Sequence, residues 1–98
     1  MKKTNELLIE LLVDFLPTDR DSAVNQSEIS DYLSLSKRSV RQLVQQARHE
    51  GHPICSTPYD GYWLSSDAND ISSTITILRS QVNTLTKTIY DLENCIGD

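Results

Sequence analysis

The sequence predicts a mainly α-helical protein that has a small β-hairpin and ends in a long helix. Three observations predict this fold class. Apolar residues recur at spacings of three and four within residues 5–16 and 25–51, which is the period of an amphipathic helix. Two short β-prone runs flank a loop that contains proline and Asp-Gly within residues 54–64. From Ile71 to Ile96 the apolar residues follow an unbroken rhythm of four and three.

Length and composition indicate one small domain with one additional element. The chain has 98 residues, of which 38% are hydrophobic and 23% charged, and its three glycines and three prolines exclude a low-complexity protein. The apolar N-terminal stretch is interrupted by Glu6, Glu10 and Asp14, which favours an amphipathic helix over a signal peptide. With no export signal, we expect Cys55 and Cys95 to be free thiols in the cytoplasm.

The first helix is predicted to start at a cap on Thr4 or Asn5 and to end before Pro17. We expect its core face to consist of Leu7, Leu8, Leu11, Leu12, Phe15 and Leu16. A polar loop follows at residues 17–22. The apolar pair at residues 23–24 is long enough for a minimal strand.

Two further helices joined by a tight turn are predicted between residues 25 and 51. Asn25 is a good N-cap, and Glu28 stands at capping-box spacing from it. The apolar face of this helix is Ile29, Tyr32 and Leu33. Leu35 fills the corner of the turn, and Ser36 caps a helix over residues 37–50, which Gly51 ends in a left-handed conformation. This later helix is expected to bury Val40, Leu43, Val44 and Ala47.

The opposite face of residues 37–50 carries the functional signal, because Arg, Lys, Gln and Ser side chains contact phosphates and base edges in a DNA major groove. Four of the nine basic residues lie between Tyr32 and His49, where no acidic residue occurs. The net charge of −5 therefore conceals a local charge of +4. The predicted DNA-contacting residues are Ser36, Lys37, Arg38, Ser39, Arg41, Gln42, Gln45, Arg48 and Tyr59. An ordinary solvated polar face is the alternative.

The predicted hairpin joins residues 54–56 to residues 62–64. We expect Ile54 and Leu64 to point into the core together with one aromatic residue, and Trp63 to serve packing rather than nucleic-acid stacking. The Tyr59 hydroxyl can reach a phosphate, whereas Asp60 repels one. Because no Lys or Arg lies between residues 53 and 66, the hairpin is expected to contribute little to DNA binding.

Residues 66–98 are predicted to form a separate helix after the domain of residues 1–65, with Ser66 or Asp67 as its cap. The predicted dimerisation residues are Ile71, Ile75, Leu78, Val82, Leu85, Ile89, Leu92 and Ile96. Branched residues at the a positions and mostly leucine at d favour a parallel two-stranded coiled coil with a second copy. Antiparallel pairing and folding back onto the chain's own domain are the alternatives.

Nothing in the sequence indicates an enzyme or a cofactor. His49 and His52 straddle Gly51 without further ligands nearby, so no metal site is expected. No nucleophile and base pair and no Gly-rich phosphate loop occur. We also expect no membrane association and no small-molecule ligand.

Residues 5–65 resemble the winged helix-turn-helix superfamily. The segments that carry the resemblance are Ser27-Glu28-Ile29, Leu35-Ser36, Arg38-Ser39-Val40-Arg41, Gly51-His52-Pro53-Ile54 and Gly61-Tyr62-Trp63-Leu64. The last two are similar to the DNA-binding domain of biotin-operon repressors, and still more to small winged-helix proteins of phages and conjugative plasmids. The resemblance implies a wing of two to three β-strands, and this chain departs from it in lacking a basic wing.

These expectations combine into a sequence-specific double-stranded DNA-binding protein that acts as a homodimer. Its role is either that of a transcription regulator or that of an accessory factor at a mobile-element origin of plasmid transfer, replication or excision. The alternative is a winged-helix protein-interaction adaptor that does not bind DNA itself.

Overall fold

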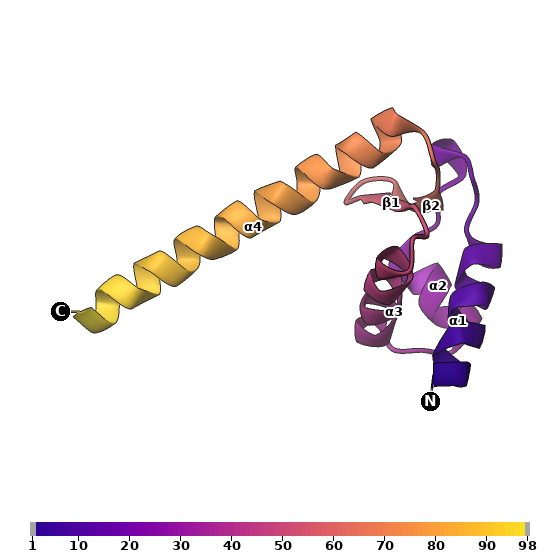
Figure 1. Ribbon diagram of the computed structural model, residues 1–98, viewed down its shortest axis with the longest axis horizontal. Coiled ribbons are helices and arrows are strands. Elements are labelled where there is room, and N and C mark those ends of the chain that lie inside the picture. The colour runs from indigo at the N-terminus through magenta and orange to yellow at the C-terminus, as the bar shows by residue number, and fades with distance from the viewer. Residues whose placement is uncertain (1, 98) are drawn as a thin grey trace.

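The chain folds into three short helices, a β-hairpin and one long helix. The computed structural model describes the backbone of residues 2–97 and the side chains of residues 5–96. The elements in order are α1 (Lys2–Phe15), a 3₁₀ turn (Arg20–Ser22), α2 (Gln26–Leu33), α3 (Lys37–His49), β1 (Ile54–Thr57), β2 (Gly61–Leu64) and α4 (Ala68–Gly97). Helices α1 to α3 and the hairpin gather into one body, from which α4 projects (Figure 1). The predicted mainly α class, with a small hairpin and a long last helix, is confirmed. Residues 1 and 98 lie outside the described part.

The core lies where α1, α2 and α3 meet one face of the hairpin. Its buried members are Ile9, Leu12, Leu16, Ile29, Leu33, Val40, Leu43, Val44, Ala47 and Ile54. All four predicted core residues of α3 are among them, which confirms that face. Tyr32, predicted for the core face of α2, is instead exposed and stacks on Phe15 at a ring-centroid distance of 4.2 Å.

The predicted core face of α1 is confirmed at Leu12 and Leu16, which are buried, and at Leu8 and Phe15, which pack against the core, but it is wrong at Leu7 and Leu11. Leu7 and Leu11 remain 61% and 45% exposed, whereas Ile9 is buried. The predicted set was too wide, since Leu7 and Leu16 are nine residues apart and therefore on opposite sides of a helix with 3.6 residues per turn. Helix α1 also begins by Lys2 rather than after a cap at residues 4–5, because lysine is a good helix former and nothing stops the helix there.

The capping predictions for α2 and α3 are confirmed. The Asn25 side chain accepts a hydrogen bond from the Glu28 amide at 2.8 Å, and the Glu28 carboxylate accepts one from the Asn25 amide at 3.4 Å. At α3 the Ser36 side chain alone forms the cap, by accepting a hydrogen bond from the Ser39 amide. Helix α3 ends at His49, one residue earlier than predicted, and Gly51 has the expected left-handed conformation with φ of 96°.

The hairpin is antiparallel, with Ile54 opposite Leu64 and Thr57 opposite Gly61. Trp63 is fully buried and Ile54 nearly so, as predicted, and Leu64 packs against the core. The predicted minimal strand at residues 23–24 is reduced to a single bridge, in which Val24 exchanges two backbone hydrogen bonds with Tyr62 at 3.0 and 2.7 Å.

Gly61 is required at the end of the hairpin loop. Its φ of 101° is left-handed, and a Cβ atom there would lie 2.4 Å from the Val24 carbonyl oxygen. Because Val24 approaches so closely, any side chain at position 61 would force the backbone of the bridge to move.

Helix α4 begins at the predicted cap. The Asp67 carboxylate accepts hydrogen bonds from the amides of Asn69 at 2.8 Å and Asp70 at 3.2 Å. Every described side chain from Arg79 to Ile96 is exposed, so the alternative in which this helix folds back onto its own domain is wrong. Among the described helices, none combines the length and the apolarity that a bilayer crossing requires.

Candidate nucleic-acid interface

The outer face of α3 presents a free cationic surface. Lys37, Arg38 and Arg41 are exposed, and so are Gln42 and Gln45. Within the described part of the chain, the ion pairs are Arg20–Asp60 and Lys87–Asp91, so no carboxylate neutralises the cations of α3. These five side chains project from one rigid rod of 13 residues, which lets them contact an extended polyanion together.

Ser36 and Ser39 lie at the start of α3 but are already engaged with each other. The Ser36 hydroxyl accepts a hydrogen bond from the Ser39 amide at 3.1 Å and lies 3.0 Å from the Ser39 hydroxyl. Their oxygens therefore fix the first turn of α3. The backbone amides of this first turn add the positive end of the helix dipole to the cationic surface.

Arg48 is placed differently from the other basic residues. Its Nε donates to the Ile54 carbonyl oxygen at 2.8 Å, and its Nη2 donates to the Ser56 hydroxyl at 3.1 Å. The side chain is only partly exposed, and this burial lowers the pKa of its guanidinium, although the fields of Tyr62 and Cys55 oppose the shift. Arg48 thus ties α3 to β1, a role that the spacing within α3 alone did not indicate.

The tip of the hairpin combines one exposed aromatic residue with a neutralised carboxylate. Tyr59 is 97% exposed. The Asp60 carboxylate accepts hydrogen bonds from the Thr57 hydroxyl at 2.8 Å and from Arg20 at 2.9 Å, and these two contacts hold its pKa below the usual range. Arg20 comes from the turn after α1, so the sequence of the hairpin gave no sign that a cation reaches it.

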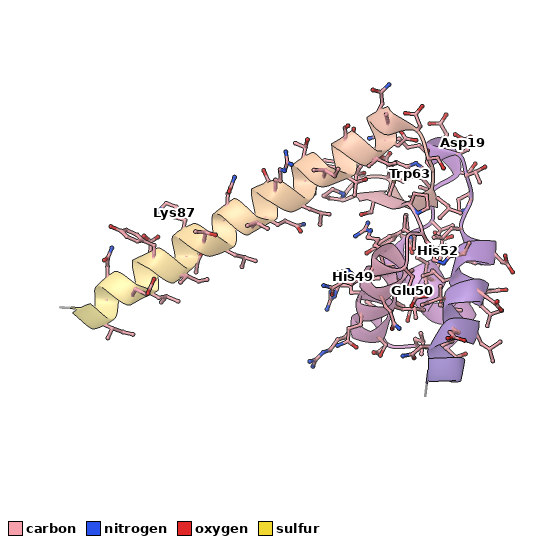
Figure 2. The ribbon with its side chains drawn as sticks, viewed as in Figure 1. Asp19, His49, Glu50, His52, Trp63 and Lys87 are labelled. Atoms are coloured by element: carbon pink, nitrogen blue, oxygen red, sulfur yellow. The ribbon has the colours of Figure 1, made fainter. Side chains whose placement is uncertain are left out.

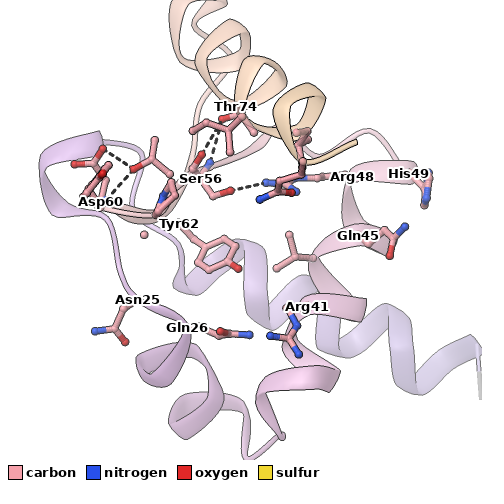
Figure 3. A pocket seen from close by; sticks show the side chains of 18 residues that line it. Asn25, Gln26, Arg41, Gln45, Arg48, His49, Ser56, Asp60, Tyr62 and Thr74 are labelled. Atoms are coloured by element: carbon pink, nitrogen blue, oxygen red, sulfur yellow. Dashed lines mark hydrogen bonds between the residues drawn. The ribbon is translucent and has the colours of Figure 1, made fainter. Parts of the chain in front are cut away.

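A groove of about 730 Å³ separates α3 from the start of α4, and the hairpin forms its floor (Figure 3). Arg41, Gln45 and Arg48 line its α3 side. Gln26 of α2 and Tyr62 of β2 also line the groove. The sequence did not indicate either residue, because it does not show that α2 and β2 lie beside α3. The Gln26 side chain donates to the Lys37 carbonyl oxygen at 2.8 Å, which holds the starts of α2 and α3 together.

Helix α3 itself contains no acidic residue, although Glu50 follows it directly. The acidic side chains of α1 and α2 that the structure describes are exposed: Glu6, Glu10, Asp14, Glu28 and Asp31. Figure 2 shows His49 at the outer side of α3, while α1 covers the opposite side of the body. The exposed cations of α3 and the exposed carboxylates of α1 and α2 are therefore carried by different helices.

The eight predicted dimerisation residues form one continuous apolar stripe along α4. Ile71, beside the hairpin, is partly buried, and the other seven are between 40% and 86% exposed. From Val82 to Ile96, no other part of the described chain covers this stripe.

Sequence comparison adds no family to these observations. No protein-family model matches the chain, and no curated protein matches it.

Proposed function

We propose that this protein is a winged helix-turn-helix protein that binds double-stranded DNA sequence-specifically as a homodimer. The observation that carries the proposal is the free cationic face of α3 in a molecule whose net charge is −5. An ordinary solvated polar face does not account for three exposed, unpaired cations on one side of α3, because α3 itself carries no acidic side chain to balance them.

In this proposal α3 enters the major groove. Arg38, Arg41 and Gln42 read base edges, since Arg pairs bidentately with guanine and Gln with adenine. Lys37 and Gln45 contact phosphates. The hairpin acts as a wing that places Tyr59 against the DNA backbone, and its Asp60 is less repulsive than the sequence implied because Arg20 pairs with it at 2.9 Å.

The homodimer forms through α4. A helix that leaves seven large apolar side chains exposed at heptad positions gains stability when a second copy covers them. Two copies then present two α3 helices to two half-sites, as dimeric helix-turn-helix proteins do.

Two biological roles fit a DNA-binding dimer of this size. One is a transcription regulator, and the other is an accessory factor at a mobile-element origin. Footprinting on the DNA that surrounds the gene separates them, because a regulator protects a promoter and an accessory factor protects an origin.

The test of DNA binding is a titration against a randomised duplex pool, followed by measurement of the selected site at several salt concentrations. Arg48 is held by the hairpin. The log–log salt slope should therefore lie between about −0.9 per subunit, if Lys37 alone neutralises a phosphate, and about −2.7, if Arg38 and Arg41 do so as well, at ~0.9 per neutralised phosphate. Arg41→Ala should weaken binding by about 1 kcal/mol or more. Lys87→Ala is the control, since Lys87 pairs with Asp91 on α4 at 3.0 Å. A slope near zero refutes the proposal.

A protein-interaction adaptor is the second candidate, and one observation favours it. Leu7, Leu11 and Tyr32 leave apolar surface exposed beside the acidic side chains of α1 and α2. If no duplex is bound even at low salt, and Leu7→Asp abolishes co-purification of a defined partner, the adaptor replaces the DNA-binding proposal.

A further inference from the structure

The start of α4 is fastened to the edge of the hairpin by one buried hydroxyl. Thr74 is only 5% exposed. Its Oγ1 accepts a hydrogen bond from the Ser56 amide at 3.1 Å and can donate to the carbonyl oxygens of Asp70 at 3.1 Å and Ser56 at 3.4 Å. These contacts join the second turn of α4 to β1 (Figure 3).

Thr74 occupies a position where the sheet has unsatisfied groups. Ser56 pairs with Tyr62, but the amide and carbonyl of Tyr62 bond to Val24 on the far side of β2. Ser56 and Tyr62 are therefore a non-hydrogen-bonded pair, and the polar backbone groups of Ser56 point away from β2. Thr74 therefore supplies a hydrogen-bond partner to the amide and carbonyl groups of Ser56 on the open edge of β1.

A second attachment lies one turn earlier. The Asp70 carboxylate accepts hydrogen bonds from the buried Trp63 indole nitrogen at 3.1 Å and from the Ser65 hydroxyl at 2.8 Å. The Ser65 amide in turn donates to the Pro53 carbonyl oxygen at 3.0 Å. The polar segment between β2 and α4 is therefore held at both ends, and the Thr74 contact one turn later sets the direction in which α4 leaves the body.

The same strand also holds α3. Arg48 donates to the Ile54 carbonyl oxygen and to the Ser56 hydroxyl. Ser56 thus receives α3 through its side chain and α4 through its backbone. A continuous series of contacts therefore runs from α3 through β1 to α4. Its member on α3 is Arg48, whose guanidinium is hydrogen-bonded to β1.

We propose that Arg48, Ser56 and Thr74 are positioning residues that hold α3 at a fixed angle to α4 and so determine the spacing and symmetry of the two DNA half-sites. The inference rests on the proposed function, since half-sites exist only if the dimer binds DNA. A rigid connection makes the dimer select inverted half-sites at one spacing, whereas a hinged connection lets it accept many.

Because α4 is long, a small change in its angle to the body displaces its far end by a large distance. From Thr74 to Ile96 the helix rises about 33 Å at ~1.5 Å per residue, so a swing of about 10° at Thr74 moves its far end by about 6 Å. Within a dimer joined by α4, the same swing displaces the α3 helices relative to each other. One base-pair step is only about 3.4 Å, so even a small hinge movement would change the accepted spacing.

The experiment measures binding to a series of selected sites whose half-sites are moved apart by single base pairs. Wild-type protein should lose about tenfold or more in affinity when the spacing changes by about two base pairs, because both distance and helical phase change. Thr74→Val, which keeps the shape and removes the hydroxyl, should flatten this profile, and Thr74→Ser should restore it. Thr76→Val is the matched control, since Thr76 makes the same bond to the carbonyl four residues earlier but is exposed.

A second measurement needs no DNA. Residual dipolar couplings of wild-type protein should fit one alignment tensor for the body and α4 together, whereas Thr74→Val should require two. If wild type already needs two tensors, or binds all spacings equally well, the positioning role is refuted. If wild type binds no duplex at all, the proposed function fails, and the couplings still decide whether the connection is rigid.

Discussion

Leu85 lies near the middle of the exposed stripe of α4 and offers the sharpest test of the dimer. It is 62% exposed in the single chain. Leu85→Lys replaces it with a charge at a predicted d position, where two copies face each other in a parallel coiled coil. The substitution should dissociate the dimer and leave the rest of the protein folded, since no residue of the body contacts this part of α4.

The expected magnitude follows from the area that remains to be buried. Full burial of a leucine side chain stabilises by about 1.5–3 kcal/mol. Since Leu85 is 62% exposed, roughly three fifths of this gain remains, or about 1–2 kcal/mol per chain and about 2–4 kcal/mol per dimer. At about 1.4 kcal/mol per tenfold, the dimer dissociation constant should rise about 30- to 1,000-fold, before the repulsion between two lysines is added.

Sedimentation equilibrium measures the dissociation constant directly. Thr84→Lys is the matched control, because it adds the same charge one residue earlier on the outer side of the helix and should leave dimerisation nearly unchanged. Near-ultraviolet circular dichroism of the buried Trp63 verifies that the body stays folded in both variants. If Leu85→Lys associates as tightly as wild type, the stripe is not the interface, and a wild-type protein that is monomeric throughout refutes the dimer itself.

Three further predictions concern the body. Gly61→Ala should lower the free energy of unfolding by about 1–2 kcal/mol from its left-handed backbone alone, and by more because of the contact with the bridge; urea unfolding at wild-type stability would contradict the steric argument. A thiol reagent should modify Cys95 rapidly and Cys55 only on unfolding, since Cys55 is buried and burial raises the pKa of its thiol; equal rates would show that Cys55 is accessible. Hydrogen bonds from Ser65 and Trp63 hold the pKa of Asp70 below its usual range, so this group stabilises the fold above about pH 4 and loses that contribution as the pH falls through its folded pKa. Asp70→Asn should make urea unfolding less dependent on pH in that interval, and an unchanged dependence would contradict the assignment.

Local signals predicted most of the fold because they depend on residues close together in the sequence. The capping box at Asn25, the cap at Ser36 and the cap at Asp67 each require only a side chain and a backbone amide two or three residues away. The left-handed conformation of Gly51 requires only a residue without a side chain directly after the helix. The core face of α3 was also predictable, since apolar and cationic residues separate cleanly around it. Helix α1 has no such separation on its apolar side, and for that reason Leu7 and Leu11 were wrongly included in its core face while Ile9 was missed.

In the candidate interface, too, some residues could be predicted from local sequence and others could not. The exposed cations Lys37, Arg38 and Arg41 follow from their position opposite the core face of α3. Arg48 lies closer to the core, and its role was decided by where β1 passes. Arg20 reaches the hairpin tip across 40 residues of sequence, and no local pattern encodes such a contact.

The sequence alone determined which segments are helical, where α2, α3 and α4 begin, and which face of α3 is apolar and which cationic, because helix periodicity and capping are local properties. Only the tertiary structure decided which cations are free, which carboxylates are neutralised, and that Thr74 joins α4 to the edge of the hairpin. Those outcomes depend on distances between segments that are far apart in sequence, and packing around the shared core sets these distances.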